Sequence, residues 1–234
     1  MEKKTFDYKI LIKPLIGIIT YIILMIILPE VLPDLSGNMD KTLYAILLNF
    51  IIYFIAFIIL TLTYKKELVY EFKKENKLSF NDLIVNSFGC YGLILLGSFV
   101  GNLITTAFGG GQSENQATIE IILKSQYGIF AILFIAFLGP VCEELVFRKS
   151  IIGLCDKFKV SRYLSIALSS LLFGLIHVTG FGDFINMFPY VFMGVGIAIM
   201  YNKTDNILVP ILGHIINNSI SVIIILSGIT NNIQ

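Results

Sequence analysis

Residues 43–64 read LYAILLNFIIYFIAFIILTLTY, a run that contains no charged side chain. A helix needs about 20 consecutive apolar residues to cross the roughly 30 Å hydrocarbon core of a bilayer, and this run is long enough. Because lipid offers no hydrogen bonds, a spanning segment must pair its own backbone groups, which a helix does. The run therefore predicts a membrane-spanning helix.

The same character extends along the whole chain. Of its 234 residues, 56% are hydrophobic and 14% are charged, and the mean hydropathy is +0.84. A soluble domain needs a more polar surface than this composition supplies. We predict an all-α, polytopic membrane helical bundle of about seven transmembrane helices, forming one integral-membrane domain over 1–234 in contact with membrane lipids. The expected spans lie near 14–32, 43–64, 83–107, 127–154, 161–178, 184–201 and 206–227.

The distribution of basic residues predicts the orientation. Cytoplasmic loops keep an excess of lysine and arginine. With the amino terminus inside, all but Lys41 and Lys124 of the 17 basic residues fall on the cytoplasmic side, and the carboxyl terminus faces out. The net charge of +1 gives no reason to expect a nucleic acid partner.

Two connecting segments have distinct compositions. Residues 65–82 place apolar side chains among lysines and glutamates, which predicts a short amphipathic helix on the membrane surface, with a solvated charged loop as the alternative. Residues 109–115 read GGGQSEN and are expected to be flexible, because glycine imposes no preference on φ. This second segment either gates access from outside or merely connects two spans.

A Glu143-Glu144-x-x-x-Arg148 motif lies within an apolar run, where ionisable side chains cost a few kcal/mol each. Residues four apart share a helix face, so we expect Glu144 to pair with Arg148, whereas Glu143 is rotated by about 100° and points elsewhere. Glu143 is then free to accept a proton from water in a poorly hydrated cavity. Pro140 removes one backbone hydrogen bond and is expected to kink this helix.

The two histidines of the chain, His177 and His214, also lie in apolar runs. Phe173 shares a face with His177 and can pack against its ring. His214 and Asn218 share a face as well, and two donors aimed at one point can hold a developing oxyanion.

The expected depths of these residues agree. At about 1.5 Å of rise per residue, Glu143 and Asn218 lie about 18 Å from the cytoplasmic ends of their helices, His177 about 22 Å and His214 about 12 Å. Taken singly, each histidine is as easily a structural hydrogen-bond donor between helices, and the Glu144–Arg148 pair a buried structural bridge. The shared depth favours one intramembrane site.

The order Glu-Glu-x-x-x-Arg, Phe-x-x-x-His and His-x-x-x-Asn on successive membrane helices resembles the CAAX protease and bacteriocin-processing family of intramembrane proteases, also called the Abi family. The resemblance covers a catalytic core over 129–226. It implies that Glu143 is the general base, that His177 positions the attacking water, and that His214 and Asn218 stabilise the oxyanion. Glu144, Arg148 and Phe173 would then organise the site.

The resemblance leaves the cofactor open. A metal-free glutamate mechanism is favoured, and a zinc ion held by Glu143, His177 and His214 is the alternative, since two histidines and a carboxylate can complete a catalytic zinc shell.

The family further implies hydrolysis of a hydrophobic peptide or membrane-anchored protein in a bacterial plasma membrane, in peptide maturation, bacteriocin self-immunity or peptide signalling. A non-proteolytic immunity or scaffold protein and a proton-coupled transporter are the rival interpretations; the halves of the chain show no clear internal repeat of the transporter kind.

Overall fold

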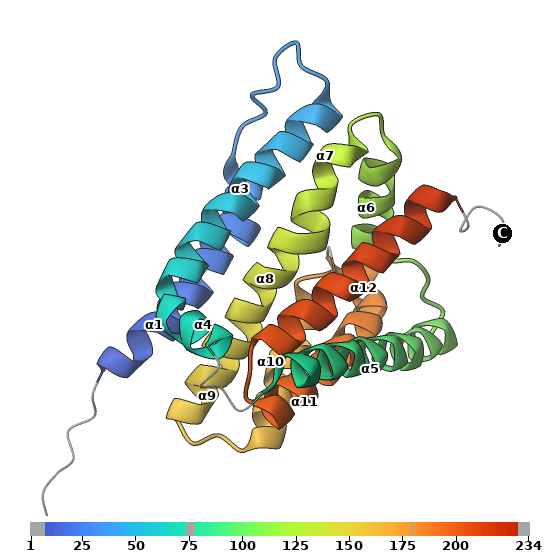
Figure 1. Ribbon diagram of the computed structural model, residues 1–234. Coiled ribbons are helices and arrows are strands. Elements are labelled where there is room, and N and C mark those ends of the chain that lie inside the picture. Colours follow the sequence, from blue (N-terminus) through green and yellow to red (C-terminus); the bar gives the residue numbers. More distant parts are fainter. Residues whose placement is uncertain (1–7, 74–77, 179, 229–234) are drawn as a thin grey trace, which may run out of the picture.

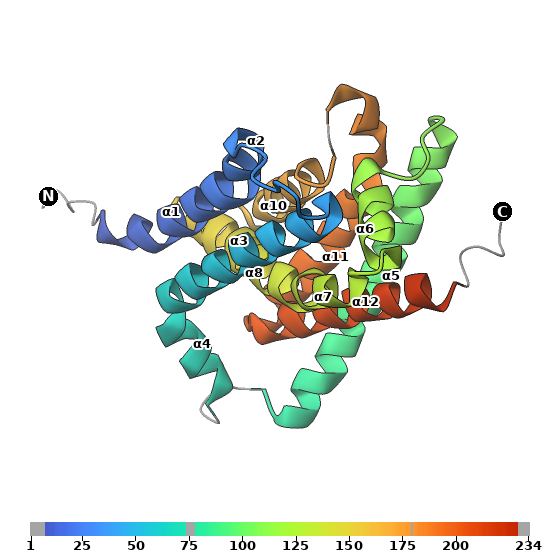
Figure 2. The ribbon, with the colours of Figure 1, turned by 90° about the horizontal axis from the view of Figure 1, so that it is seen from above.

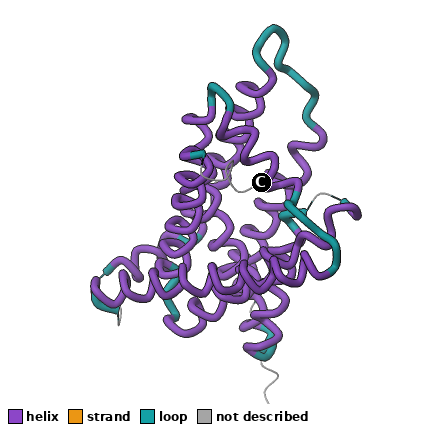
Figure 3. Tube along the Cα trace, turned by 90° about the vertical axis from the view of Figure 1, so that its right-hand side faces the viewer, coloured by secondary structure: helices purple, strands orange, loops and turns teal. Residues whose placement is uncertain are grey.

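The computed structural model describes residues 8–73, 78–178 and 180–228. Within these ranges the regular structure is helical, without strands (Figure 3). In this described part of the chain, six helices are long and apolar enough to cross a membrane, which confirms the all-α polytopic bundle of an integral membrane protein. They are Lys9–Val31, Lys41–Thr63, Phe80–Ala107, Gly128–Lys157, Gly182–Thr204 and Leu208–Ser227.

The segment expected as a fifth span, 161–178, is shorter than predicted. It forms α10 (Arg162–Leu175), whose 14 residues rise only about 21 Å. The chain leaves the helix after Leu175 and reaches Gly180 with a φ of 83°, a left-handed conformation that favours glycine. A short 3-10 helix, η4 (Phe181–Met187), then leads into α11 (Phe188–Thr204). His177 therefore lies in a turn rather than inside a spanning helix.

The helix Gly128–Lys157 lies in the middle of the bundle (Figures 1 and 2). In the apolar 18-residue stretch of this helix, 67% of the residues are buried, against 17% to 44% in the corresponding stretches of the other spans. The helix therefore faces protein on most of its circumference. This helix carries the Glu-Glu-x-x-x-Arg motif. It is built from α7 (Gly128–Leu133), the π-helical η2 (Phe134–Leu138), α8 (Gly139–Glu144), the π-helical η3 (Leu145–Ile152) and α9 (Gly153–Lys157).

The amino-terminal spans cover one side of this central helix (Figure 1). They are joined to it by one buried core in which Tyr21 packs edge-on against Phe147, with ring centroids 5.7 Å apart. The elements concerned are α1 (Lys9–Tyr21), the π-helical η1 (Ile22–Ile27), α2 (Leu28–Val31) and α3 (Lys41–Thr63).

Glycines set the packing of α5 (Phe80–Ala107) and α12 (Leu208–Ser227) on the other side. A Cβ added at Gly97 would lie 2.3 Å from the carbonyl oxygen of Phe192, so only glycine allows α5 to approach α11 this closely. A Cβ at Gly213 would lie 2.7 Å from the Cβ of Cys90, which marks the point where α12 crosses α5. Beyond this crossing the two helices diverge, as Figures 1 and 2 both show.

The amphipathic segment between the second and third spans forms a helix, α4 (Lys65–Phe72), where a solvated loop was the alternative; its residues 74–77 lie outside the described part. Glu71 of α4 is buried, and its carboxylate accepts from Lys149 Nζ and from the backbone N–H of Ile207. The helix is thus anchored to the ends of two spans, while Phe72 is exposed.

Candidate active site

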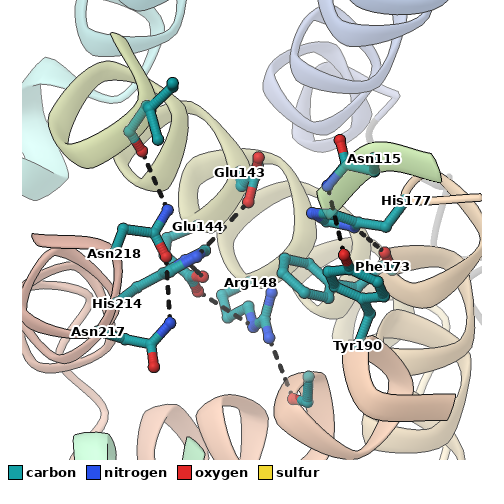
Figure 4. A network of polar contacts seen from close by, with 12 residues as sticks. Asn115, Glu143, Glu144, Arg148, Phe173, His177, Tyr190, His214, Asn217 and Asn218 are labelled. Carbon is teal, nitrogen blue, oxygen red and sulfur yellow. Dashed lines mark hydrogen bonds and ion pairs between the residues drawn. The ribbon is translucent and has the colours of Figure 1, made fainter. Parts of the chain in front are cut away.

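A cavity of about 750 Å³ opens among α3, α5, α6 (Glu114–Lys124), α8, α11 and α12. Glu143, His177, His214 and Asn218 all line it (Figure 4). The structure therefore brings together the four residues that the sequence singled out as one site, although they come from three separate parts of the chain. Their chemical roles stay predictions.

Glu144 lies behind the cavity wall in a fully buried cluster. Its Oε2 is 3.2 Å from Nε of Arg148, which confirms the expected pairing at four-residue spacing, and both side chains have no exposed surface. Arg148 also donates from Nη2 to the carbonyl oxygen of Gly194 at 3.0 Å, and its guanidinium lies 5.0 Å from the centre of the Phe173 ring. A buried charge needs such partners, because leaving it alone costs several kcal/mol.

The second oxygen of Glu144 contacts His214, which the sequence did not indicate. Nδ1 of His214 lies 2.9 Å from Oε1 of Glu144. Since a carboxylate only accepts hydrogen bonds, Nδ1 carries the proton and Nε2 is the ring atom turned toward Glu143. Arg148, Glu144 and His214 thus form one chain of charge-assisted contacts that fixes the imidazole ring.

Glu143 points the other way, into the cavity, as its rotation on the helix predicted (Figure 4). It retains 7% exposure. Its Oε2 is 3.8 Å from Nε2 of His214, which is longer than a hydrogen bond. The carboxylate is therefore held near the imidazole and still faces the open space.

His177 is fixed by three contacts with two residues. Its Nδ1 lies 2.7 Å from the carbonyl oxygen of Phe173, so Nδ1 donates and Nε2 of the neutral ring is left with its lone pair. The predicted packing of Phe173 against the ring is confirmed, with centroids 4.7 Å apart. Tyr190, which the sequence reading missed, stacks on the other side at 4.4 Å with an angle of 15° between the ring planes.

Asn218 is held by a backbone irregularity in the central helix. Its Nδ2 donates to the carbonyl oxygen of Ile135 at 3.0 Å. Ile135 belongs to the π-helical stretch η2, where the N–H five residues later is the normal partner. That residue is Pro140, which has no N–H, so the freed carbonyl is satisfied by the side chain of Asn218.

A segment expected as a loop contributes to the cavity. The sequence reading placed no helix after residues 109–115, yet Ser113 caps α6, its Oγ accepting from the N–H of Gln116 at 3.2 Å. Residues of this segment line the cavity beside the site. The signal for the helix was the Ser113-Glu114 start followed by an amphipathic run, and its short length hid it.

Hydrogen bonds hold this segment against α11 and η4. Ser113 Oγ lies 2.7 Å and Asn115 Nδ2 lies 3.4 Å from the hydroxyl of Tyr190. The N–H of Gly111 donates to Oδ1 of Asn186 at 3.0 Å. Gly111 is therefore bonded to η4, and Ser113 and Asn115 are bonded to α11.

The three residues of the zinc alternative do not fit a zinc ion in this arrangement. Among residues 8–73, 78–178 and 180–228, no group of three or more His, Cys, Asp or Glu side chains is placed to hold a metal.

Comparison with known proteins finds similarity over part of the chain. Residues 125–220 match the family described as type II CAAX prenyl endopeptidase Rce1-like. Over 126 residues the chain is 32% identical to the putative membrane peptidase YdiL of Bacillus subtilis, covering 53% of this chain and 48% of the relative. Over 134 residues it is 30% identical to the membrane-embedded CAAX protease MroQ of Staphylococcus aureus, covering 57% and 54%.

The chain thus spans about half the length of the curated relatives it matches. No solved structure matches it. The resemblance to CAAX proteases that the motifs indicated is confirmed over residues 125–220. This part contains the four predicted site residues that line the cavity, Glu143, His177, His214 and Asn218.

Proposed function

We propose that this protein is an intramembrane endopeptidase that hydrolyses hydrophobic or membrane-associated peptides in a bacterial plasma membrane. The observation that carries the proposal is the shared cavity, in which the Glu143 carboxylate, the ring of His177 and the amide of Asn218 face one open space inside an apolar bundle. The match of residues 125–220 to CAAX endopeptidases supports a peptide as substrate.

In the proposed reaction a water molecule lies between Glu143 and Nε2 of His177. The Glu143 carboxylate and Nε2 of His177 both accept hydrogen bonds, so together they orient the water. Glu143 takes one proton of the water as the water oxygen attacks the peptide carbonyl. Glu143 then passes this proton to the nitrogen of the scissile bond, which leaves as an amine, and the other product keeps the carboxyl group. The carboxylate returns to its starting form without a covalent intermediate.

Negative charge on the former carbonyl oxygen requires donors. Asn218 uses one Nδ2 proton for Ile135 and keeps the second for the oxyanion. His214 donates to Glu144 from Nδ1, so its Nε2 stabilises the oxyanion when the ring carries both protons. Glu144 is a positioning residue in this scheme, because it acts through His214.

The biological role proposed is bacterial peptide maturation, bacteriocin self-immunity or peptide signalling. The names of the two relatives, a CAAX protease and a putative membrane peptidase from bacteria, support the peptidase part of this proposal.

The experiment that tests the function is cleavage of a fluorogenic hydrophobic peptide by purified protein in detergent. Glu143→Gln should lower turnover by about 10²- to 10⁴-fold, the usual contribution of a general base, with an unchanged unfolding temperature. The matched control is Glu30→Gln, the same chemical change at an exposed position of α2. Undiminished turnover in Glu143→Gln, or no cleavage by the wild-type protein across a library of hydrophobic peptides, overturns the proposal.

A further inference from the structure

The part of α5 that diverges from α12 has three distinct faces. Gly97, Gly101 and Thr105 pack against α11 and η4. Leu96, Phe99 and Leu103 are more than half exposed and form an apolar outer face suited to lipid. A third face carries Ser98, Asn102 and Thr106, all of which line the cavity that contains Glu143. We call these three residues the polar ladder.

The polar ladder is unusual for a membrane-spanning helix. Polar side chains at membrane depth are costly unless they find hydrogen-bond partners or line a cavity. Asn102 and Thr106 are exposed rather than packed. Across the cavity α12 presents Asn217 and Ser221, so uncharged hydrogen-bonding groups face the space from both sides.

The spacing of the ladder fits an extended peptide. Side chains four apart on a helix repeat at about 6 Å. In an extended chain the N–H and C=O groups that point to one edge belong to every second residue and repeat at about 6.6 Å. Ser, Asn and Thr each both donate and accept, so each rung can serve one such N–H and C=O pair.

The charge of the cavity lining favours an uncharged substrate segment. Glu143 is the one acidic residue among the described residues that line the cavity, and this lining includes no lysine or arginine. A charged substrate side chain placed along the ladder would have no counter-ion in a poorly hydrated space. An extended backbone in lipid, by contrast, needs partners for each of its polar groups.

We propose that the polar ladder is a substrate-binding subsite that holds an uncharged segment of peptide in extended conformation and leads it to Glu143. The three rungs span about 12 Å, the length of about four extended residues. This inference rests on the proposed peptidase function, since the ladder would feed the same catalytic group.

The test measures binding separately from cleavage. A fluorescent, acetylated and amidated peptide of about ten alanine and leucine residues is titrated onto Glu143→Gln protein in detergent. Replacing Asn102 by Leu should weaken binding about three- to tenfold, and replacing all three rungs as Ser98→Ala, Asn102→Leu and Thr106→Val about 30-fold or more. Asn86→Leu is the matched control, because Asn86 lies on the same helix, is half-buried and does not line the cavity.

A scan of the peptide with single N-methyl groups sharpens the result. Each N-methyl removes one backbone donor, so the loss of affinity should alternate with a period of two residues, and the alternation should vanish in the triple variant. The proposal is overturned if Glu143→Gln protein binds the peptide equally well with and without the three ladder substitutions. It is also overturned if the N-methyl scan shows no alternation. If the wild-type protein cleaves no peptide but binding still depends on the ladder, the peptidase function is rejected. The ladder then remains supported as a peptide-binding site.

Discussion

Glu143 and Glu144 are neighbours in the chain, but they belong to two regions with opposite properties. Glu144 is fully buried between Arg148 and His214. Glu143 lies on the wall of a cavity of about 750 Å³, with its Oε2 3.8 Å from Nε2 of His214. The sealed region fixes side chains in place, and the open region leaves space for a substrate. A rotation of about 100° along one helix separates the two tasks.

Removing Glu144 should break the sealed region and have the largest effect on stability. Glu144→Ala leaves Arg148 buried without its counter-ion, which should lower the free energy of unfolding by about 3–5 kcal/mol. The measurement is unfolding of the purified protein in detergent, followed by its helical circular dichroism signal. Glu143→Ala is the comparison and should lose turnover with little loss of stability. Equal destabilisation by the two changes would contradict the division into a sealed and an open region.

The same region can be rebuilt without charge. Glu144→Leu with Arg148→Met should recover most of the stability lost in Glu144→Ala, because two well-packed apolar side chains replace a buried ion pair at little net cost. Turnover should stay low, since His214 loses the carboxylate that holds its Nδ1. Recovery of both stability and turnover would show that Glu144 does not position His214.

Tyr190 tests the open region. Tyr190→Leu removes the ring stacked on His177 and should lower kcat about tenfold, within the range of effects expected when a catalytic group is mispositioned. Tyr190→Phe keeps the stack but releases Ser113 and Asn115, so it should raise KM with kcat nearly unchanged. Tyr163→Leu, at a position that is 85% exposed, is the control. A parallel fall of stability and kcat in both Tyr190 variants would indicate a purely structural role.

The smallest effect concerns the hydrogen bond that holds Asn218 on the cavity wall. Asn218→Ala should cost about 1 kcal/mol of stability, because the carbonyl oxygen of Ile135 loses its donor. Pro140→Ala supplies a backbone N–H for that oxygen, so the cost of Asn218→Ala should largely disappear in this background. A double-mutant cycle from unfolding curves measures the coupling. Additive costs would show that Pro140 does not create the need for Asn218.

The features that depend on local pattern were predictable from the sequence. Apolar runs of sufficient length predicted the bundle, and four-residue spacing predicted the pairing of Glu144 with Arg148 and the packing of Phe173 on His177. The length of α10 was overestimated, because hydropathy continues past Leu175 while the backbone turns there. Orientation in the membrane stays a prediction.

The features that depend on contacts between distant residues were beyond the sequence. His214 and Glu144 are 70 residues apart, Tyr190 reaches Ser113 across 77 residues, and the ladder on α5 faces α12 across the cavity.

The sequence by itself determined a helical membrane protein and named the four residues of its candidate site, because hydropathy and helical periodicity act between near neighbours. The tertiary structure decided that Glu144 also contacts His214, which nitrogen of each histidine faces the cavity and what lines the path to Glu143. Those outcomes follow from how helices cross, and crossing angles depend on glycine contacts such as Gly97 and Gly213, whose partners lie far away in the chain.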